Sequence, residues 1–230
     1  MKYPTITALM VTMGRLPLVH ESYKFFTTQT YPQKRLLVVT DCTQKEHEAL
    51  KKLAYDDKRV LVMHVGERLS LGELRNLSLE YSTSDLTIQW DDDDWYGPTR
   101  IMDQWTGLKK ASAVMLKQQL HYFRDTGKVA LTCDPTGIEG TLLMDRRCGL
   151  TYPSQKKGED TVLKKDLTER KLLNLVPGGV CYCRTYHGNN TWDRSHHLDR
   201  VKNFKKPITK KELKDAEKTY GKHMVDMSDM

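Results

Sequence analysis

Short apolar segments alternate with more polar segments along the first 95 residues. The apolar segments are continuous, which is typical of strands buried on both faces of a parallel sheet. The longer segments between them favour helices, and one begins with a capping box formed by Ser70 and Glu73. The pattern predicts strands over residues 5–11, 36–39, 60–63 and 86–90, and helices over 16–29, 44–53 and 70–81.

The second half of the chain has a less regular pattern. It indicates helices over residues 101–117 and 160–172, strand-like pieces over 119–133 and 141–144, and a turn and strand over 175–186. Thr209 and Glu212 form a second capping box, which begins a charged helix that ends near Gly221. We therefore expect an α/β fold with a mostly parallel, Rossmann-like sheet and helices on both faces.

This pattern also suggests a division of the chain. We expect one domain over residues 1–192, with a nucleotide-binding half over 1–95 and an acceptor half over 96–192. Residues 193–230 are expected to form a basic helical tail that leaves the domain near Pro207.

The formal net charge of +7 shows that the surface is basic overall. Between residues 193 and 222, ten Lys or Arg residues face five Asp or Glu residues, so most of the excess lies late in the chain. Such a surface attracts an anionic partner, such as a nucleotide, a nucleic acid, an acidic glycan or a membrane face. The chain contains no apolar run near the ~18 residues that span a bilayer, which argues against an integral membrane protein. A polar start and an odd number of cysteines favour the cytoplasm.

Four consecutive aspartates, Asp91 to Asp94, directly follow the strand predicted over residues 86–90. Carboxylates this close repel one another unless a cation or bound donor groups compensate. The alternative is an acidic loop in solvent. The position at a strand end favours a site, because doubly wound sheets bind ligands at the carboxyl ends of their strands. Oxygen ligands there suit Mg²⁺ or Mn²⁺ that bridges the phosphates of a nucleotide.

Several motifs follow one another in an order typical of one enzyme family. Residues 6–41 combine a strand, a polar turn, a helix ending in Gln-Thr-Tyr-Pro and a strand ending in Asp. Leu-Gly-Glu-Leu-Arg-Asn, Trp-Asp-Asp-Asp-Asp-Trp, Lys-Gly-Glu-Asp and Arg-Thr-Tyr-His-Gly-Asn-Asn follow at residues 71–76, 90–95, 157–160 and 184–190. In this order the chain up to Trp192 resembles the family 2 glycosyltransferases. The resemblance implies a GT-A fold and the metal-dependent, inverting transfer of a sugar from a nucleotide diphosphate, with UDP favoured, to an acceptor hydroxyl.

The resemblance also implies roles for individual residues. Asp160 is expected to be the general base, with Glu159 beside it to orient the site. The donor-binding residues are expected to be Thr12, Arg15, Asp41, Arg75, Asp91 and Asp92. The metal ligands are expected to be Asp91, Asp93 and His187. Apart from the resemblance, Trp95 and Trp192 are expected to contact the sugar or acceptor, because aromatic faces beside a sugar-transfer site often pack on sugar rings.

The chemistry of sugar transfer agrees with these roles. Charge develops on the leaving phosphates, which a divalent cation stabilises, and the attacking hydroxyl must lose a proton to a base. Structural explanations stay open for several residues. Glu159 and Asp160 also suit the first turn of a helix electrostatically. His187 can be a hydrogen-bonded structural histidine, and Trp95 and Trp192 can be core residues.

Two other functions stay open at this point. One is a nucleotide-sugar or nucleic-acid binding module that has lost catalysis, against which the intact Asp91, Asp93 and Asp160 argue. The other is a nucleotidyltransferase, for which only Gly14-Arg15 hints at a Gly-rich loop. The acceptor is also open between a glycan and a hydroxylated base in DNA, as in phage-type DNA-modifying glycosyltransferases. The basic segment 194–222 can follow DNA phosphates or be a solvated charged helix.

Overall fold

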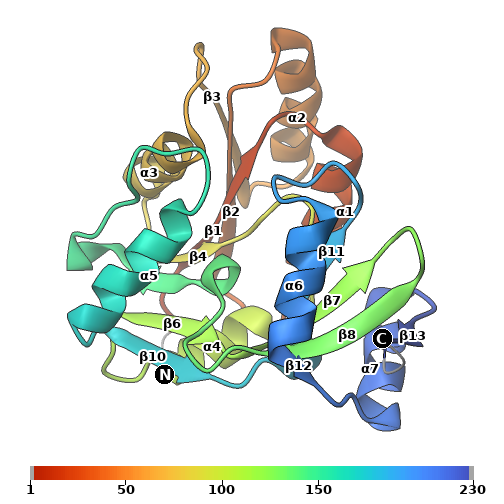
Figure 1. Cartoon of the computed structure of the whole chain (residues 1–230). Helices are drawn as coiled ribbons and strands as arrows, with labels where there is room; N and C mark the ends of the chain where they lie inside the picture. Colours follow the sequence, from red (N-terminus) through yellow and green to blue (C-terminus); the bar gives the residue numbers. More distant parts are fainter. Residues whose placement is uncertain (1–2, 228–230) are drawn as a thin grey trace.

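The larger of two sheets has seven strands. A computed structural model describes residues 3–227, and in it the strands lie in the order β10, β6, β9, β4, β1, β2, β3 (Figure 1). Neighbouring strands are parallel except where β9 pairs with β4 and β6. The strands are β1 Ile6–Thr12, β2 Lys34–Thr40, β3 Val60–His64, β4 Leu86–Gln89, β6 Ala113–Leu116, β9 Leu143–Asp145 and β10 Leu173–Val176.

Helices cover both faces of this sheet, because successive side chains of a strand point to opposite sides. Ile6, Ala8 and Met10 of β1 share one core cluster with residues of α1, α2 and α4. Leu9 of the same strand packs in the other core cluster with residues of α3 and α5. The predicted α/β fold is thereby confirmed. The helices are α1 Leu16–Thr27, α2 Gln44–Asp56, α3 Leu71–Tyr81, α4 Arg100–Leu108 and α5 Glu159–Glu169.

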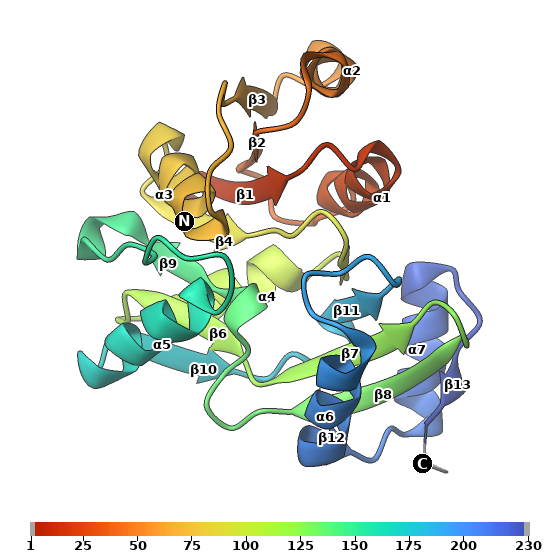
Figure 2. The same cartoon turned by 45° about the horizontal axis from the view of Figure 1, so that its top comes forward.

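A second sheet of six strands adjoins the first, because β6 leads through Lys117 into β7. Its strands lie in the order β12, β8, β7, β11, β5, and β13 also pairs with β8. Helices α6 and α7 cover its two sides, as Figure 2 shows. The elements are β5 Trp95–Tyr96, β7 Gln118–Phe123, β8 Lys128–Cys133, β11 Tyr182–Tyr186, α6 Arg194–Phe204, β12 Lys205–Lys206, α7 Lys210–Tyr220 and β13 Val225–Asp226.

The segment predicted as a separate tail is instead part of this second sheet. Strand β12 pairs antiparallel with β8, and β13 pairs parallel with it. Tyr220 of α7 is buried, and its ring centre lies 5.8 Å from that of Trp95. The helical content of the segment agrees with the prediction, but its separation from residues 1–192 does not. Residues 228–230 of the predicted tail lie outside the described residues.

Some element boundaries also differ from the prediction. Helix α4 ends at Leu108, where Lys109 adopts a positive φ of 47°, and β6 follows within the range predicted as one helix. The capping boxes of Ser70 with Glu73 and of Thr209 with Glu212 begin α3 and α7 as predicted. Within residues 3–227, no helix has the length and apolar character required to cross a membrane.

Candidate active site

A cleft of about 190 Å³ lies where the carboxyl end of β4 meets the amino end of α5. Residues 91–94 after β4 form one wall, and residues 157–161 at the start of α5 form another. Strand β11 contributes Tyr182 and Arg184, and the loop before α6 contributes residues 190–192. The parallel strands therefore place Asp91 to Asp94, which we call the aspartate run, at the edge of the sheet where such folds bind their ligands.

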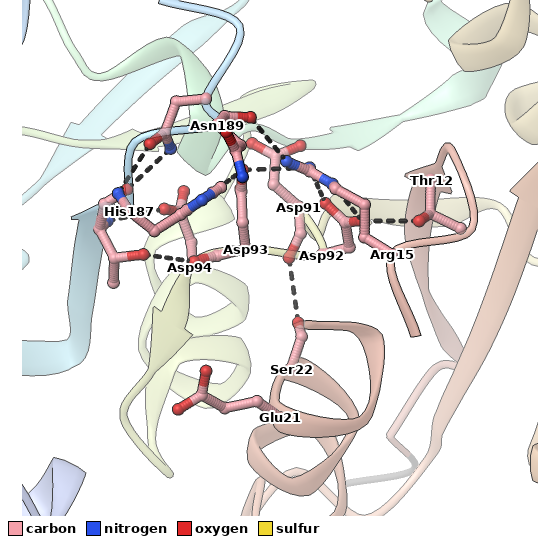
Figure 3. A network of polar contacts seen from close by, with 12 residues as sticks. Thr12, Arg15, Glu21, Ser22, Asp91, Asp92, Asp93, Asp94, His187 and Asn189 are labelled. Atoms are coloured by element: carbon pink, nitrogen blue, oxygen red, sulfur yellow. Dashed lines mark hydrogen bonds and ion pairs between the residues drawn. The ribbon is translucent and has the colours of Figure 1, made fainter. Parts of the chain in front are cut away.

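The four aspartates of this run, drawn in Figure 3, differ in their exposure to solvent. Asp92 and Asp94 are buried, whereas the side chains of Asp91 and Asp93 are 28% and 14% exposed. Two of the carboxylates are thus bonded inside the protein, and the other two are accessible from the cleft.

Asp92 ties the end of β1 to the aspartate run. Its carboxylate accepts a 2.6 Å hydrogen bond from the hydroxyl of Thr12 and a 3.2 Å bond from Nε of Arg15. Burial raises the pKa of Asp92 to about 6, with the charge of Asp93 adding to the rise and Arg15 opposing it. Thr12, Arg15 and Asp92, which are all expected to bind the sugar nucleotide, therefore contact one another. The carboxylate of Asp92 is buried and is not exposed to a bound sugar nucleotide.

Asp94 ties β11 to the aspartate run. It accepts hydrogen bonds from the hydroxyl of Tyr182 and, at 2.9 Å, from the backbone N–H of Thr185. Burial raises the pKa of Asp94 to about 8, and the charges of Asp93 and Asp91 add to this rise. These bonds hold the aspartate run against the second sheet.

Asp93 meets two predicted partners. Nε2 of His187 lies 3.2 Å from its Oδ2, and Nη2 of Arg15 lies 3.1 Å from the same atom. Burial alone would raise the pKa of Asp93, but the hydrogen bond with His187 and the charge of Arg15 hold it below the ordinary value. The structure therefore brings Asp93 and His187 together as an anionic carboxylate beside an imidazole.

The residues present fit a divalent cation that is bound together with a nucleotide. Across residues 3–227, no group of three or more His, Cys, Asp and Glu side chains is arranged to enclose a metal by itself. Mg²⁺ is usually held by one or two carboxylates and substrate phosphates rather than by an all-protein cage. Asp91 and Asp93 supply two accessible carboxylates in one cleft. Their charges also add to the rise in the pKa of Asp94, and a bound cation would relieve this repulsion among the carboxylates.

Asp160 lies in the first turn of α5 and lines the same cleft as Asp91 and Asp93. Burial raises its pKa, and the charges of Glu139 and Asp91 add to this rise against the opposing charge of Arg75. The neighbouring Glu159 is buried and points to Arg75 instead, with Oε1 2.8 Å from Nε. Both acidic residues line the cleft, but Asp160 is the more exposed of the two, and Glu159 is paired with Arg75.

Trp95 does not occupy the position expected of a sugar contact. It is 1% exposed and packs in the core of the second sheet, with its ring centre 6.3 Å from Phe25 and 4.9 Å from Tyr122. Asp41 is also buried, and it accepts a 3.0 Å bond from Arg68. Trp192, by contrast, lines the cleft.

Four basic residues that the sequence does not predict as site residues line the cleft: Lys157, Arg184, His196 and Arg200. The imidazole of His196 stacks on the ring of Trp192 with centres 4.3 Å apart, and Nζ of Lys157 lies 5.0 Å from the same ring. His196 and Arg200 are four residues apart on α6 and thus share one face. That spacing, directly after Trp192, is the sequence signal that could have identified them.

Comparisons with known proteins find a matching family model and solved structures of similar fold. The family model described as Glycosyl transferase family 2 matches residues 7–148. S. aureus TarS 1–349 in complex with UDP is 13% identical, with a TM-score of 0.66 over 87% of this chain and 72% of that chain. The same TarS fragment in complex with UDP-GlcNAc is 13% identical, with a TM-score of 0.67 over 81% of this chain and 60% of that chain.

A mannosyltransferase, PcManGT from Pyrobaculum calidifontis in complex with GDP-Man and Mn²⁺, is 12% identical, with a TM-score of 0.65 over 95% of this chain and 69% of that chain. At such identities the likeness to solved structures establishes the fold. A search of curated proteins found no match.

Proposed function

Because the chain belongs to glycosyl transferase family 2, we propose that it transfers a sugar, with inversion, from a nucleoside diphosphate sugar to an acceptor hydroxyl in a reaction that requires Mn²⁺ or Mg²⁺. We favour a UDP-sugar as the donor, since two of the solved structures of similar fold contain UDP or UDP-GlcNAc, whereas one contains GDP-Man. Membership of this family removes the support for a nucleotidyltransferase.

One observation carries this proposal. Asp160, in the first turn of α5, lines the same cleft as Asp91 and Asp93, which follow β4 almost 70 residues earlier in the chain. A transfer reaction needs groups of these two kinds on either side of one sugar. The raised pKa of Asp160 also makes it a stronger base than an ordinary aspartate.

The residues divide into two roles. Asp160 accepts the proton of the acceptor hydroxyl as its oxygen bonds to the anomeric carbon, while the bond from that carbon to the diphosphate oxygen breaks. A single displacement of this kind inverts the anomeric centre. Asp91 and Asp93, with His187 beside them, would hold the divalent cation, which when bound stabilises the charge on the diphosphate. Arg184 lines the same cleft and can contact the diphosphate.

The acceptor is proposed to be a glycan or a hydroxylated DNA base. The position of α6 favours DNA, because this helix both lines the cleft through His196 and Arg200 and belongs to the most basic segment of the chain. Lys202, near the end of this helix, and Lys206, just after it, are also exposed. A basic surface that adjoins the cleft can follow phosphates, and an aromatic side chain such as Trp192 can stack on a base.

The proposal is tested by incubating the protein with Mn²⁺ and a panel of UDP- and GDP-sugars, with and without hydroxymethylated DNA or glycan acceptors. We expect release of the nucleoside diphosphate with at least one donor, and loss of that release in Asp160→Asn. Nucleotide binding without any release would identify a binding module instead. Release of pyrophosphate from a nucleoside triphosphate would identify a nucleotidyltransferase.

A further inference from the structure

Arg75 of α3 is held between two carboxylates that are far apart in the chain. Its Nε lies 2.8 Å from Oε1 of Glu159, and its Nη2 lies 3.3 Å from Oδ1 of Asp91. The side chains of Arg75 and Glu159 are only 9% and 2% exposed. One guanidinium therefore joins the start of α5 to the aspartate run after β4.

Two other residues of α3, Gly72 and Asn76, contact the segment that leads into α5. Nδ2 of Asn76 donates a 2.8 Å hydrogen bond to the carbonyl of Tyr152, whose N–H donates at 2.8 Å to Oδ1 of Asn76. A Cβ on Gly72 would lie 1.9 Å from the carbonyl oxygen of Pro153, so the close approach of the two segments requires glycine. Gly72 and Asn76 thus contact the segment that leads into α5, and Arg75 contacts the first residue of that helix.

The positive charge of Arg75 compensates the negative charge of the buried Glu159. Burial disfavours its charged form, but Asp91 and Glu159 outweigh this effect and raise its pKa, so it stays cationic. Burial raises the pKa of Glu159, and Arg75 opposes that rise. Without the guanidinium, Glu159 would be a buried carboxylate with no cation, which is an unfavourable state.

We infer that Arg75, which also lines the cleft, is a positioning residue that sets Asp160 at a fixed place relative to Asp91, and that this role dominates over any contact with the nucleotide. The inference rests on the proposed function, in which Asp160 is the base and Asp91 faces the diphosphate. Asp160 directly follows Glu159 in the first turn of α5, so fixing the carboxylate of Glu159 fixes the direction of Asp160. A displacement of about 1 Å in such a group can reduce turnover by ~10²-fold.

The test compares Arg75→Lys and Glu159→Gln with wild type, using the donor from which wild type releases most diphosphate. Arg75→Lys keeps the charge but loses the geometry that bridges two carboxylates, and Glu159→Gln removes the anchor while preserving its shape. We expect kcat to fall by ~10²-fold in each, with the Kd for the nucleotide and Mn²⁺ changed by less than about threefold. The exposed Arg35→Lys, on β2, is the matched control and should not change kcat.

The double variant adds a second readout. If Arg75 acts through Glu159, Arg75→Lys combined with Glu159→Gln should lose no more turnover than the worse single variant. A nucleotide contact predicts the reverse pattern, with a weakened Kd, an unchanged kcat and additive effects, and that pattern would overturn the inference. If Arg75→Lys does not fold, Glu159→Gln alone decides, because retained kcat in that variant also overturns the inference.

Asp160→Asn, measured in parallel, separates the proposed function from the positioning role of Arg75. Full activity in Asp160→Asn would remove the proposed base, whatever Arg75 does. Loss of activity in Asp160→Asn, with only nucleotide affinity changed in Arg75→Lys and Glu159→Gln, would leave the proposed function standing and reject the positioning role.

Discussion

The hydroxyl of Thr12 donates a 2.6 Å hydrogen bond to the carboxylate of Asp92 and so fastens the end of β1 to the loop after β4. Both side chains are buried, and the same carboxylate also binds Arg15. The second aspartate of the run is therefore an internal connection between two neighbouring strand ends.

Asp92→Ala is expected to lower the free energy of unfolding by about 1–3 kcal/mol, because the buried hydroxyl of Thr12 loses the acceptor to which it donates. Urea unfolding followed by circular dichroism measures the loss. The exposed Asp56→Ala, in the last turn of α2, is the control and should stay within about 0.5 kcal/mol of wild type. Equal stability of the two variants would show that the bond with Thr12 contributes nothing to the fold.

Asp93→Ala should abolish both sugar transfer and the thermal stabilisation that a nucleotide and Mn²⁺ together give to the wild-type protein. The reason is that Asp93 is one of two accessible carboxylates for the cation. A melting curve with and without UDP and Mn²⁺ tests the binding separately from turnover. Stabilisation of Asp93→Ala equal to that of wild type would reject Asp93 as a metal ligand.

Asp160→Asn should lower kcat by ~10² or more, because an amide cannot take the proton of the acceptor hydroxyl. The affinity for the donor should change little, since the amide has almost the same shape. Steady-state kinetics with varied donor concentration separate the two quantities. A large loss of donor affinity with normal kcat would make Asp160 a binding residue.

Glu139→Gln should move the acidic limb of the pH profile to lower pH. Asp160 must be deprotonated to act as a base, and the negative charge of Glu139 is one of the causes that raise its pKa. Removing that charge lowers the pKa of Asp160, so activity persists further into acid. The profile of kcat/KM against pH measures the shift. Glu169→Gln, at the exposed end of α5, is the control and should leave the limb in place.

If the acceptor is DNA, replacing Lys202 and Lys206 together with Gln should weaken DNA binding and flatten its dependence on salt, since fewer counterions are released. Replacing Lys214 and Lys218 on α7 removes the same charge from the opposite side of the second sheet and should have little effect. Filter binding at several salt concentrations measures both. Equal effects of the two pairs, or no salt-sensitive binding by wild type, would favour a glycan acceptor.

The sequence predicts the first half of the fold well because its signals are local. The continuous apolar strands and the capping box of Ser70 with Glu73 depend only on neighbouring residues. The second sheet has no comparable signal, because β5, β12 and β13 are two residues long and are defined by partners far along the chain. For the same reason the sequence predicts a tail after Trp192, where the structure has β12 and β13 of the second sheet.

The candidate site is also predicted only in part, because some of its contacts join residues far apart in the chain. Motif order was enough to predict that Asp91, Asp93 and Asp160 belong together, and the structure places them in one cleft. Nothing local distinguishes Trp95 from Trp192, since each adjoins a motif, yet only Trp192 lines the cleft. The bond between Arg75 and Glu159 joins residues 84 positions apart, which a single sequence does not reveal.

The pairing of β8 has a consequence for how the protein is made. This strand lies between β7, which precedes it in the chain, and β12 and β13, which follow it by about 70 to 95 residues. During synthesis one edge of β8 therefore lacks its partners until residues 205–226 have left the ribosome. An unpaired edge of this kind can associate with other chains. We infer that this sheet is completed only after residue 226 has left the ribosome, and that a ribosome stalled before residue 205 holds a chain prone to aggregation.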